Sequence, residues 1–172
     1  ANDALFEVYE EIAASDEQLK NQYYELEKSR NIIKKNEQRY RLIAEASNDG
    51  FWDMDIRSEE VFSNERLSQV LGLDREEANN YINNLDKYVH INDLKKVHKI
   101  IDEIKIGVRD NYNVEYRTLN KNGKYKWILA KGRLLRDEEG KVYRVIGFHI
   151  DIEDRKVQQE QIRTLAYYDI VT

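Results

Sequence analysis

The stretch Asn120–Lys156, NKNGKYKWILAKGRLLRDEEGKVYRVIGFHIDIEDRK, carries the clearest structural signal in this chain. Aromatic and branched residues recur at roughly every second position over Tyr125–Leu134 and again over Val142–Ile152, which is the pattern of strands with one buried face. The link Arg136–Gly140 is polar and ends in glycine, which suits a hairpin turn with one residue at positive φ. The stretch therefore predicts two antiparallel strands followed by a charged helical segment.

Three more strand-like runs precede this stretch. Asn111–Leu119 alternates in the same way and leads into the turn Asn120–Gly123. Phe51–Ile56 also alternates, and Glu60–Asn64 reads as a short strand. With the helices expected between residues 65 and 106, this order predicts a five-stranded antiparallel sheet with helices packed on one face, an α+β fold.

The helices expected before the last three strands have recognisable ends. Asn64 can cap a helix over Glu65–Leu71, and Gly72 fits the position just past its C-terminus. The main helix is expected from about Leu94 to Ile104. Its apolar stripe consists of Leu94, Val97, Ile101 and Ile104.

Six short motifs follow one another along the C-terminal part of the chain. They are Glu115–Arg117, Asn122–Gly123, Lys126–Ile128, Arg136–Gly140, Ile146–Gly147 and Asp151–Lys156. Together they resemble the C-terminal half of PAS sensor domains, the part called the PAC motif, and the last one resembles the exit signal Asp-Ile-Thr-Glu-Arg-Lys of that family. The resemblance reaches back to about Tyr40 and implies the PAS fold, with the sensor domain over residues 44–152.

The chain departs from the PAS pattern at three positions. Glu153 stands in the exit signal where the family has Thr, and Met54 stands in the first strand where an aromatic residue is common. In the segment that resembles the His-Pro-x-Asp start of the main helix, Ile91 replaces Pro. We expect His90 to help form the turn there and Asn92 or Asp93 to be the N-cap.

Residues 1–43 are expected to form one long helix, because they contain no Gly or Pro and are rich in helix-forming residues. Apolar residues recur at every seventh position and define one seam of a coiled coil. A second seam is interrupted by polar residues. One clean seam predicts an adjustable homodimer, and a helix packed on its own domain by one stripe is the alternative. The seam consists of Leu5, Ile12, Leu19, Leu26 and Ile33, continued by Tyr40.

Residues 153–172 are expected to form an exit helix followed by the start of another domain. The final segment, Leu165–Thr172, reads LAYYDIVT and resembles the opening of diguanylate cyclase (GGDEF) domains, Leu-Ala-x-x-Asp-x-Leu-Thr. The catalytic Gly-Gly-Asp/Glu-Glu-Phe loop of that family is absent, so this chain is not expected to be an enzyme. The abrupt end suggests a piece of a longer protein, and the resemblance implies its own C-terminal cyclase domain as a partner.

Composition excludes several other roles. The 172 residues carry a net charge of −5 with the two signs mixed, so no basic face for nucleic acid is expected. No apolar run approaches the roughly 20 residues needed to cross a bilayer, which predicts no membrane contact and a cytoplasmic location, with anchoring of the parent protein left open. The chain has no cysteine, which excludes the cysteine–flavin photochemistry of some PAS domains.

The PAS resemblance implies a cavity between the sheet and the main helix. A filled core, or an adventitious small ligand, and a dedicated small-molecule site are both compatible with the sequence, which does not reveal the polarity of a ligand. Ala130 matters because a small residue on an inner strand face leaves space. The expected lining consists of Trp52, Met54, Val97, Ile101, Ile128, Ala130 and Phe148.

Two of the three histidines, His98 and His149, could have a functional role. His98 lies beside the apolar stripe of the main helix and is the one candidate axial ligand for a haem in the cavity. We favour a structural or surface role for it, and do not expect haem, because a lone histidine with no partner visible in the sequence is a weak signal. His149 lies in a strand whose orientation the sequence leaves open. No catalytic group or metal-binding cluster is predicted.

These observations favour a signal-relaying PAS domain that regulates a C-terminal diguanylate cyclase. The signal would leave the sheet through Asp151, Ile152, Glu153 and Arg155 and enter the exit helix. The alternative is a dimerisation and spacer module without a ligand, which would pass on a signal from an upstream sensor.

Overall fold

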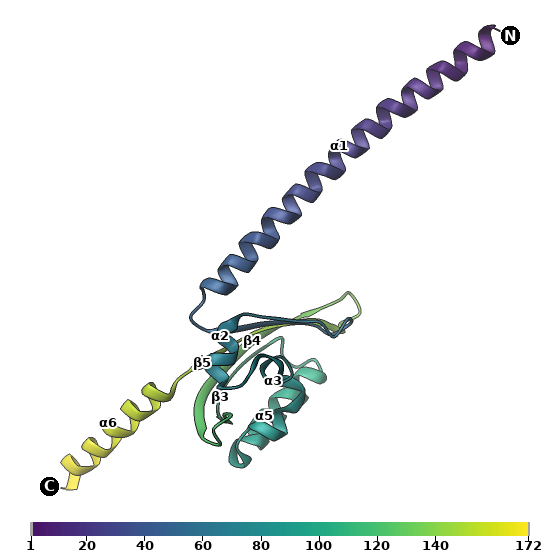
Figure 1. The fold of residues 1–172 in the computed structure, drawn as a ribbon. Helices are drawn as coiled ribbons and strands as arrows, with labels where there is room; N and C mark the ends of the chain where they lie inside the picture. The colour runs from purple at the N-terminus through teal and green to yellow at the C-terminus, as the bar shows by residue number, and fades with distance from the viewer. Residues whose placement is uncertain (1, 172) are drawn as a thin grey trace. The chain divides into compact units, whose positions relative to one another are not determined.

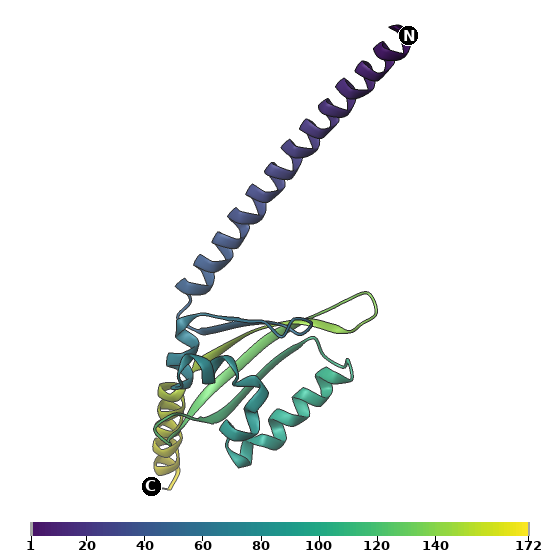
Figure 2. The same cartoon turned by 45° about the vertical axis from the view of Figure 1, so that its right-hand side comes forward.

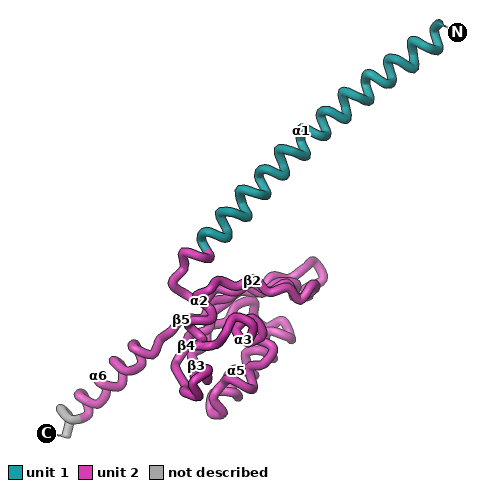
Figure 3. The backbone as a smooth tube through the Cα atoms, in the orientation of Figure 1, with its two compact units in different colours: residues 1–43 teal, residues 44–172 magenta. Residues whose placement is uncertain are grey.

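The computed structural model describes the backbone of residues 2–171 and the side chains of residues 2–167. Thr172 and the side chains of residues 168–171, which belong to the motif that resembles a cyclase start, lie outside the described part. The chain divides into two compact units, residues 1–43 and residues 44–172 (Figure 3).

A single helix, α1, spans Asn2–Ala46, which confirms the prediction of one long N-terminal helix. The aliphatic side chains that recur every seven residues are more than half exposed in the single chain, from 55% for Leu5 to 64% for Leu19, and Tyr40 at the end of the repeat is 37% exposed. An isolated helix of this kind is only marginally stable in water. The dimer expected from the heptad pattern stays a prediction.

The second unit is built on one antiparallel sheet of five strands in the order β2-β1-β5-β4-β3, which confirms the predicted fold class. Figures 1 and 2 show the helices α2 to α5 gathered on one face of this sheet. The strands are β1 (Gly50–Asp55), β2 (Val61–Ser63), β3 (Asn111–Leu119), β4 (Tyr125–Arg136) and β5 (Val142–Asp151). The helices are α2 (Glu65–Leu71), α3 (Arg75–Asn79), η1 (Ile82–Asn84), α4 (Leu85–Tyr88), α5 (Ile91–Lys105) and α6 (Glu153–Val171).

The ends of α2 follow from local sequence. The side chain of Asn64 accepts a hydrogen bond from the backbone N–H of Leu67, and Gly72 adopts φ 65° just past the helix. Both features were predicted, because Asn satisfies a free N–H group at a helix start and Gly tolerates a left-handed conformation at its end.

The start of α5 differs from the prediction. The helix begins at Ile91, and its N-cap is His90, whose Nδ1 accepts a hydrogen bond from the backbone N–H of Asn92 at 3.2 Å. The expectation of Asn92 or Asp93 as the cap is wrong, because both lie inside the helix. The carboxylate of Asp93 is instead held by Arg117 on β3.

A pair of glycines shapes the inner face of the sheet. Gly147 on β5 pairs with Gly132 on β4, and their outer neighbours across the sheet are Trp52 on β1 and Tyr112 on β3. A Cβ atom at Gly147 would lie 2.5 Å from the Tyr112 hydroxyl and 2.7 Å from the Trp52 ring, so both rings occupy space that the missing side chains leave open. The floor between these rings is therefore bare backbone.

Candidate ligand cavity and signal exit

A cavity of about 780 Å³ lies between the inner face of the sheet and helix α5. This volume is within the range of small-molecule sites, which are typically about 300–1,000 Å³. Most of its lining is apolar. Its walls come from α5 (Val97, Ile100, Ile101, Ile104), from η1 and α4 (Ile82, Leu85), and from the sheet (Trp52, Met54, Tyr112, Val114, Tyr116, Ala130, Leu134, Val145, His149).

The structure brings together most of the residues expected at a ligand site. Trp52, Met54, Val97, Ile101 and Ala130 all line the cavity. Ala130 pairs with Val114 on one side and His149 on the other. The space is not filled by the side chains around it.

Three expected lining residues lie elsewhere. Ile128 is fully buried, but in the core beside the cavity. Phe148 is on the opposite face of the sheet, where its ring packs against Phe51 at 5.2 Å between centroids. His98 is half exposed, and its Nε2 lies 2.5 Å from Asp86 on α4, so the candidate haem ligand does not reach the cavity. The expectation for Phe148 was wrong because strand parity turns its side chain to the outer face of the sheet. The half-exposed position of His98 agrees with the surface role favoured for it from the sequence.

His149 is the cavity residue that the sequence left undecided. Its neighbours in β5 are apolar on both faces of the strand, so alternation alone does not give its direction. Its pairing opposite Gly50 and Ala130 places it on the inner face, where it is 3% exposed. Knowing that Trp52 faces inward, together with the β1–β5 register, would have been enough to place it.

Four polar side chains form a buried chain beside the cavity. The Tyr81 hydroxyl donates to Thr118 Oγ1 at 2.7 Å and lies 3.4 Å from the Tyr116 hydroxyl, which in turn lies 3.3 Å from His149 Nε2. Burial raises the pKa of Tyr81 to about 12 and lowers the pKa of His149 to about 4. At neutral pH these four side chains are therefore uncharged.

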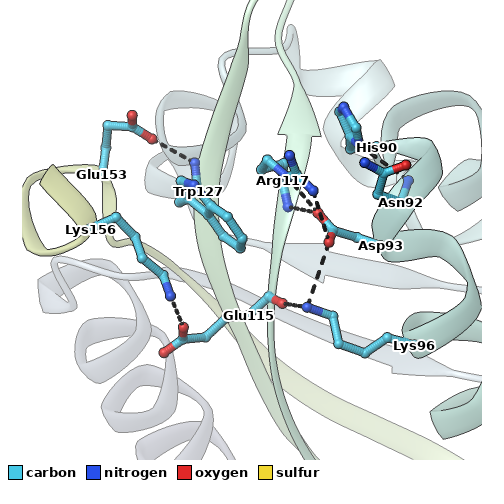
Figure 4. A network of polar contacts seen from close by, with 9 residues as sticks. All are labelled: His90, Asn92, Asp93, Lys96, Glu115, Arg117, Trp127, Glu153 and Lys156. Atoms are coloured by element: carbon cyan, nitrogen blue, oxygen red, sulfur yellow. Dashed lines mark hydrogen bonds and ion pairs between the residues drawn. The ribbon is translucent and has the colours of Figure 1, made fainter. Parts of the chain in front are cut away.

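A second set of contacts fixes the start of the exit helix α6. The Glu153 carboxylate accepts a hydrogen bond from the backbone N–H of Trp127 on β4 at 2.7 Å, as Figure 4 shows. Asp151 caps α6 by accepting from the backbone N–H of Glu153 and pairs with Lys126 at 2.7 Å. Ile152 between them is buried. Glu153, at the position where the family has Thr, thus connects the start of α6 to the sheet.

The first turn of α6 is also paired with β3. Lys156 lies 2.5 Å from Glu115, and Arg155 pairs with the same carboxylate. The hydrogen bond from Lys156 is the main reason why the pKa of Glu115 lies below its usual value. Lys156 also lies over the Trp127 ring, 4.6 Å from its centroid.

The same cluster extends to the cavity helix. Arg117 lies over the Trp127 ring at 5.1 Å, and its Nε donates to Asp93 of α5 at 2.8 Å (Figure 4). Lys96 of α5 donates to the backbone carbonyl of Glu115. Burial raises the pKa of Asp93, but the hydrogen bonds and charge of Arg117 outweigh it, so the pKa lies below its usual value. An unbroken series of contacts therefore joins α5, β3, β4 and α6.

The described residues contain neither a membrane-spanning helix nor a metal-binding cluster. No helix among them is both long and apolar enough to cross a membrane. No group of three or more His, Cys, Asp or Glu side chains among them is arranged to hold a metal ion.

The comparisons with known proteins identify the family. The family model for the PAS fold matches residues 60–149, more than half of the chain, so the chain belongs to the PAS family. Among solved structures, a sensory box histidine kinase/response regulator from Burkholderia thailandensis is 22% identical, covers 78% of this chain and 99% of its own, and superposes with a TM-score of 0.61. The N-terminal domain of a diguanylate cyclase with PAS/PAC sensor from Marinobacter aquaeolei is 21% identical over 63% of this chain and 98% of its own, with a TM-score of 0.53.

Two curated relatives match most of this chain. A blue-light-activated histidine kinase of Brucella anthropi is 28% identical over 136 residues, which cover 77% of this chain and 27% of the kinase. The sensor protein FixL of Bradyrhizobium diazoefficiens is 23% identical over 125 residues, covering 73% of this chain and 24% of that protein. The chain thus spans about a quarter of the length of these relatives and corresponds to a PAS sensory domain of signalling proteins.

Proposed function

We propose that this chain is the ligand-sensing relay domain of a larger protein whose output is a diguanylate cyclase. The observation that carries the proposal is the series of contacts that joins the cavity helix α5 to the exit helix α6 through Arg117, Trp127 and Glu115. A ligand that moves α5 by a fraction of an ångström would change the position of Arg117 and hence the packing around Trp127. The first turn of α6 would respond, because it is held by the same cluster.

The choice of output rests on the C-terminal sequence. The segment Leu165–Thr172 resembles the opening of a cyclase domain, and the exit residues Asp151, Ile152, Glu153 and Arg155 lead directly into it. A sensor kinase is the alternative output, because one curated relative is named a histidine kinase and the other a sensor protein. A cytoplasmic location belongs to the same proposal, since a cyclase draws its nucleotide substrate from the cytoplasm.

A homodimer is part of the proposed mechanism. The seam of α1, exposed in the single chain, would pair with its copy, and the outer face of the sheet offers a second contact surface around Phe148 and Phe62. A relay of this kind needs two arrangements of the dimer that differ by only a few kcal/mol, each favoured by a different ligand state.

The proposal is tested by filling the cavity in the full-length parent protein. Ala130→Leu adds bulk to the cavity wall, whereas Ala14→Leu makes the same change at an exposed position of α1. We expect the Ala130 variant to fold but to give a cyclic di-GMP output fixed at one level, while the Ala14 variant responds like the wild type. An unchanged response in a folded Ala130 variant would favour the ligand-free spacer instead.

Native mass spectrometry of the chain tests binding directly. A native dimer that carries added mass, lost on denaturation, would support both the ligand and the dimer. A dimer without added mass, in a protein freshly purified under mild conditions, would support the spacer.

A further inference from the structure

Two buried nitrogen atoms, on side chains that line the cavity, lack hydrogen-bond partners. They are Nε1 of Trp52 and Nδ1 of His149, on side chains that are 4% and 3% exposed. The two rings belong to the neighbouring strands β1 and β5, with centroids 6.3 Å apart. Leaving a buried polar group without a partner is unfavourable, so such a pair is expected to be satisfied by something outside the chain.

The hydrogen bonds among the hydroxyl groups beside the cavity determine which ring nitrogen of His149 carries the proton. The single hydroxyl proton of Tyr81 goes to Thr118, the contact of 2.7 Å, and leaves Tyr116 to donate to either His149 Nε2 or the Tyr81 oxygen. Imidazole nitrogen is far more basic than a phenol oxygen and is the better acceptor. Nε2 therefore accepts, and Nδ1 carries the N–H. Both unpartnered nitrogens are donors.

The surroundings of these donors are uncharged. His149 stays neutral at physiological pH because burial lowers its pKa to about 4. The charged residues on the cavity wall are Glu59, Lys105, Lys141 and Arg136, of which the first three are exposed and the last is paired with Asp110 at 2.6 Å. A carboxylate or phosphate buried between Trp52 and His149 would have no counter-charge there, and burying an unpaired charge is far more costly than burying a neutral group.

Building on the proposed sensing function, we infer that the ligand is an uncharged, mainly apolar molecule with a carbonyl oxygen that accepts hydrogen bonds from Trp52 Nε1–H and His149 Nδ1–H. The carbonyl supplies two lone pairs to two donors, and the remainder of the molecule lies against Met54, Ile101 and Val145, which line the same space. Ketones, quinones and lactones share this chemistry.

The test uses three probes of nearly the same shape. Acetylnaphthalene carries a ketone, ethylnaphthalene replaces it with a hydrocarbon, and naphthoate replaces it with a carboxylate. Binding of each to the full chain is measured by calorimetry, with the wild type, Trp52→Phe and Trp127→Phe. Trp52→Phe removes the indole N–H but keeps an aromatic ring in the cavity, and Trp127→Phe makes the same change at a residue that does not line the cavity.

We expect the wild type and Trp127→Phe to prefer the ketone over the hydrocarbon by about tenfold, since each hydrogen bond contributes about 0.5–1.5 kcal/mol. In Trp52→Phe this preference should fall at least threefold. Tightest binding of naphthoate would overturn the inference in favour of an anionic ligand. Equal binding of ketone and hydrocarbon would also overturn it, while leaving the cavity as a ligand site. Failure of all three probes to bind would count against the sensing function itself.

Nuclear magnetic resonance measures ligand binding on the wild type itself, and the variants serve only to assign its signals. The chain has two tryptophans, so the two indole N–H signals can be assigned from the Phe variants. The ketone should move the Trp52 signal downfield and the hydrocarbon should not. If the Trp52 signal is already that of a bonded N–H and no probe moves it, an internal water holds the donor and the inference fails. The small void of about 10 Å³ that Trp52 and His149 also line has room for one such water.

Discussion

Single residues set the dimensions of the cavity, and Gly147 is one of them. Its Cβ would lie 2.5 Å from the Tyr112 hydroxyl and 2.7 Å from two atoms of the Trp52 ring. We expect Gly147→Ala to lower the free energy of unfolding by about 1–3 kcal/mol, since overpacking forces large side chains out of position. Urea unfolding followed by circular dichroism measures this change.

Gly123→Ala is the matched control for this substitution. Its added Cβ would meet nothing within 4 Å, although its φ of 74° carries a backbone cost of its own. A Gly147 variant as stable as the wild type would show that the two rings yield without cost.

Asp93 links stability to pH. Its carboxylate accepts from the backbone N–H of Arg117 at 3.0 Å and from its guanidinium at 2.8 Å and 3.2 Å. Because the pKa of Asp93 in the folded state is below its usual value, its contribution is present above the unfolded pKa of about 3.9 and is lost as the pH falls through the lower folded value. We expect Asp93→Asn to cost about 1–3 kcal/mol at pH 7.

The difference between wild type and Asp93→Asn should therefore shrink below about pH 4, as the wild-type carboxyl takes up its proton. Urea titrations at several pH values measure it, with Asp102→Asn on the exposed face of the same helix as the control. A difference that stays constant down to the lowest pH would mean that the charge of Asp93 is not what Arg117 recognises.

At the level of elements, the junction between β3 and α6 is the most informative. Glu115 holds the first turn of α6 through Arg155 and Lys156. We expect Glu115→Gln to weaken both pairs and to raise hydrogen exchange several-fold in the backbone amides of residues 154–157, because the turn then opens more often. Global stability should change little, since exposed ion pairs contribute about 0–1 kcal/mol.

Hydrogen-exchange mass spectrometry detects this local opening. Glu160→Gln, on an exposed position of α6, makes the same change of charge and should leave residues 154–157 protected. Equal exchange in the two variants would mean that Glu153 and Ile152, and not Glu115, fix the first turn of α6.

The elements themselves were largely predictable from the sequence. The sequence located all five strands, four of them by alternation, and the caps at Asn64 and Gly72 located α2, because these signals are local. Phe148 and His149 were harder, since β5 has apolar residues on both faces and alternation then gives no direction. The N-cap of α5 was missed because Asp93 is drawn to Arg117, a residue 24 positions away that no local pattern reveals.

At the level of the whole molecule, the candidate site was also only partly predictable, because local sequence patterns do not reveal contacts between distant residues. Sequence placed Trp52, Met54, Val97, Ile101 and Ala130 in one group, and all five line the cavity. It gave no indication of the unpartnered nitrogens or of the cluster around Trp127, because these depend on the register of strands that are distant in sequence. Similarity to PAS domains likewise gives the fold but not the ligand.

The oligomeric state is also a property of the whole molecule. Replacing Leu19 and Leu26 with Lys puts two charges into the predicted seam of α1, and we expect the proposed dimer to dissociate to monomers in sedimentation equilibrium. The control is Ala14→Lys with Asn21→Lys, which adds the same charge at exposed positions off the seam. A dimer that survives the seam substitutions would be held by the sheet face instead.

The positions of the two tryptophans have a practical consequence. Trp52 is buried on the cavity wall, whereas Trp127 is partly exposed beside the cations at the start of α6. The protein thus carries one intrinsic fluorophore at each end of the proposed relay. In Trp127→Phe the remaining emission reports on occupancy of the cavity, and in Trp52→Phe it reports on the environment of the exit helix. Stopped-flow traces of the two variants would time the arrival of a ligand separately from the response of α6.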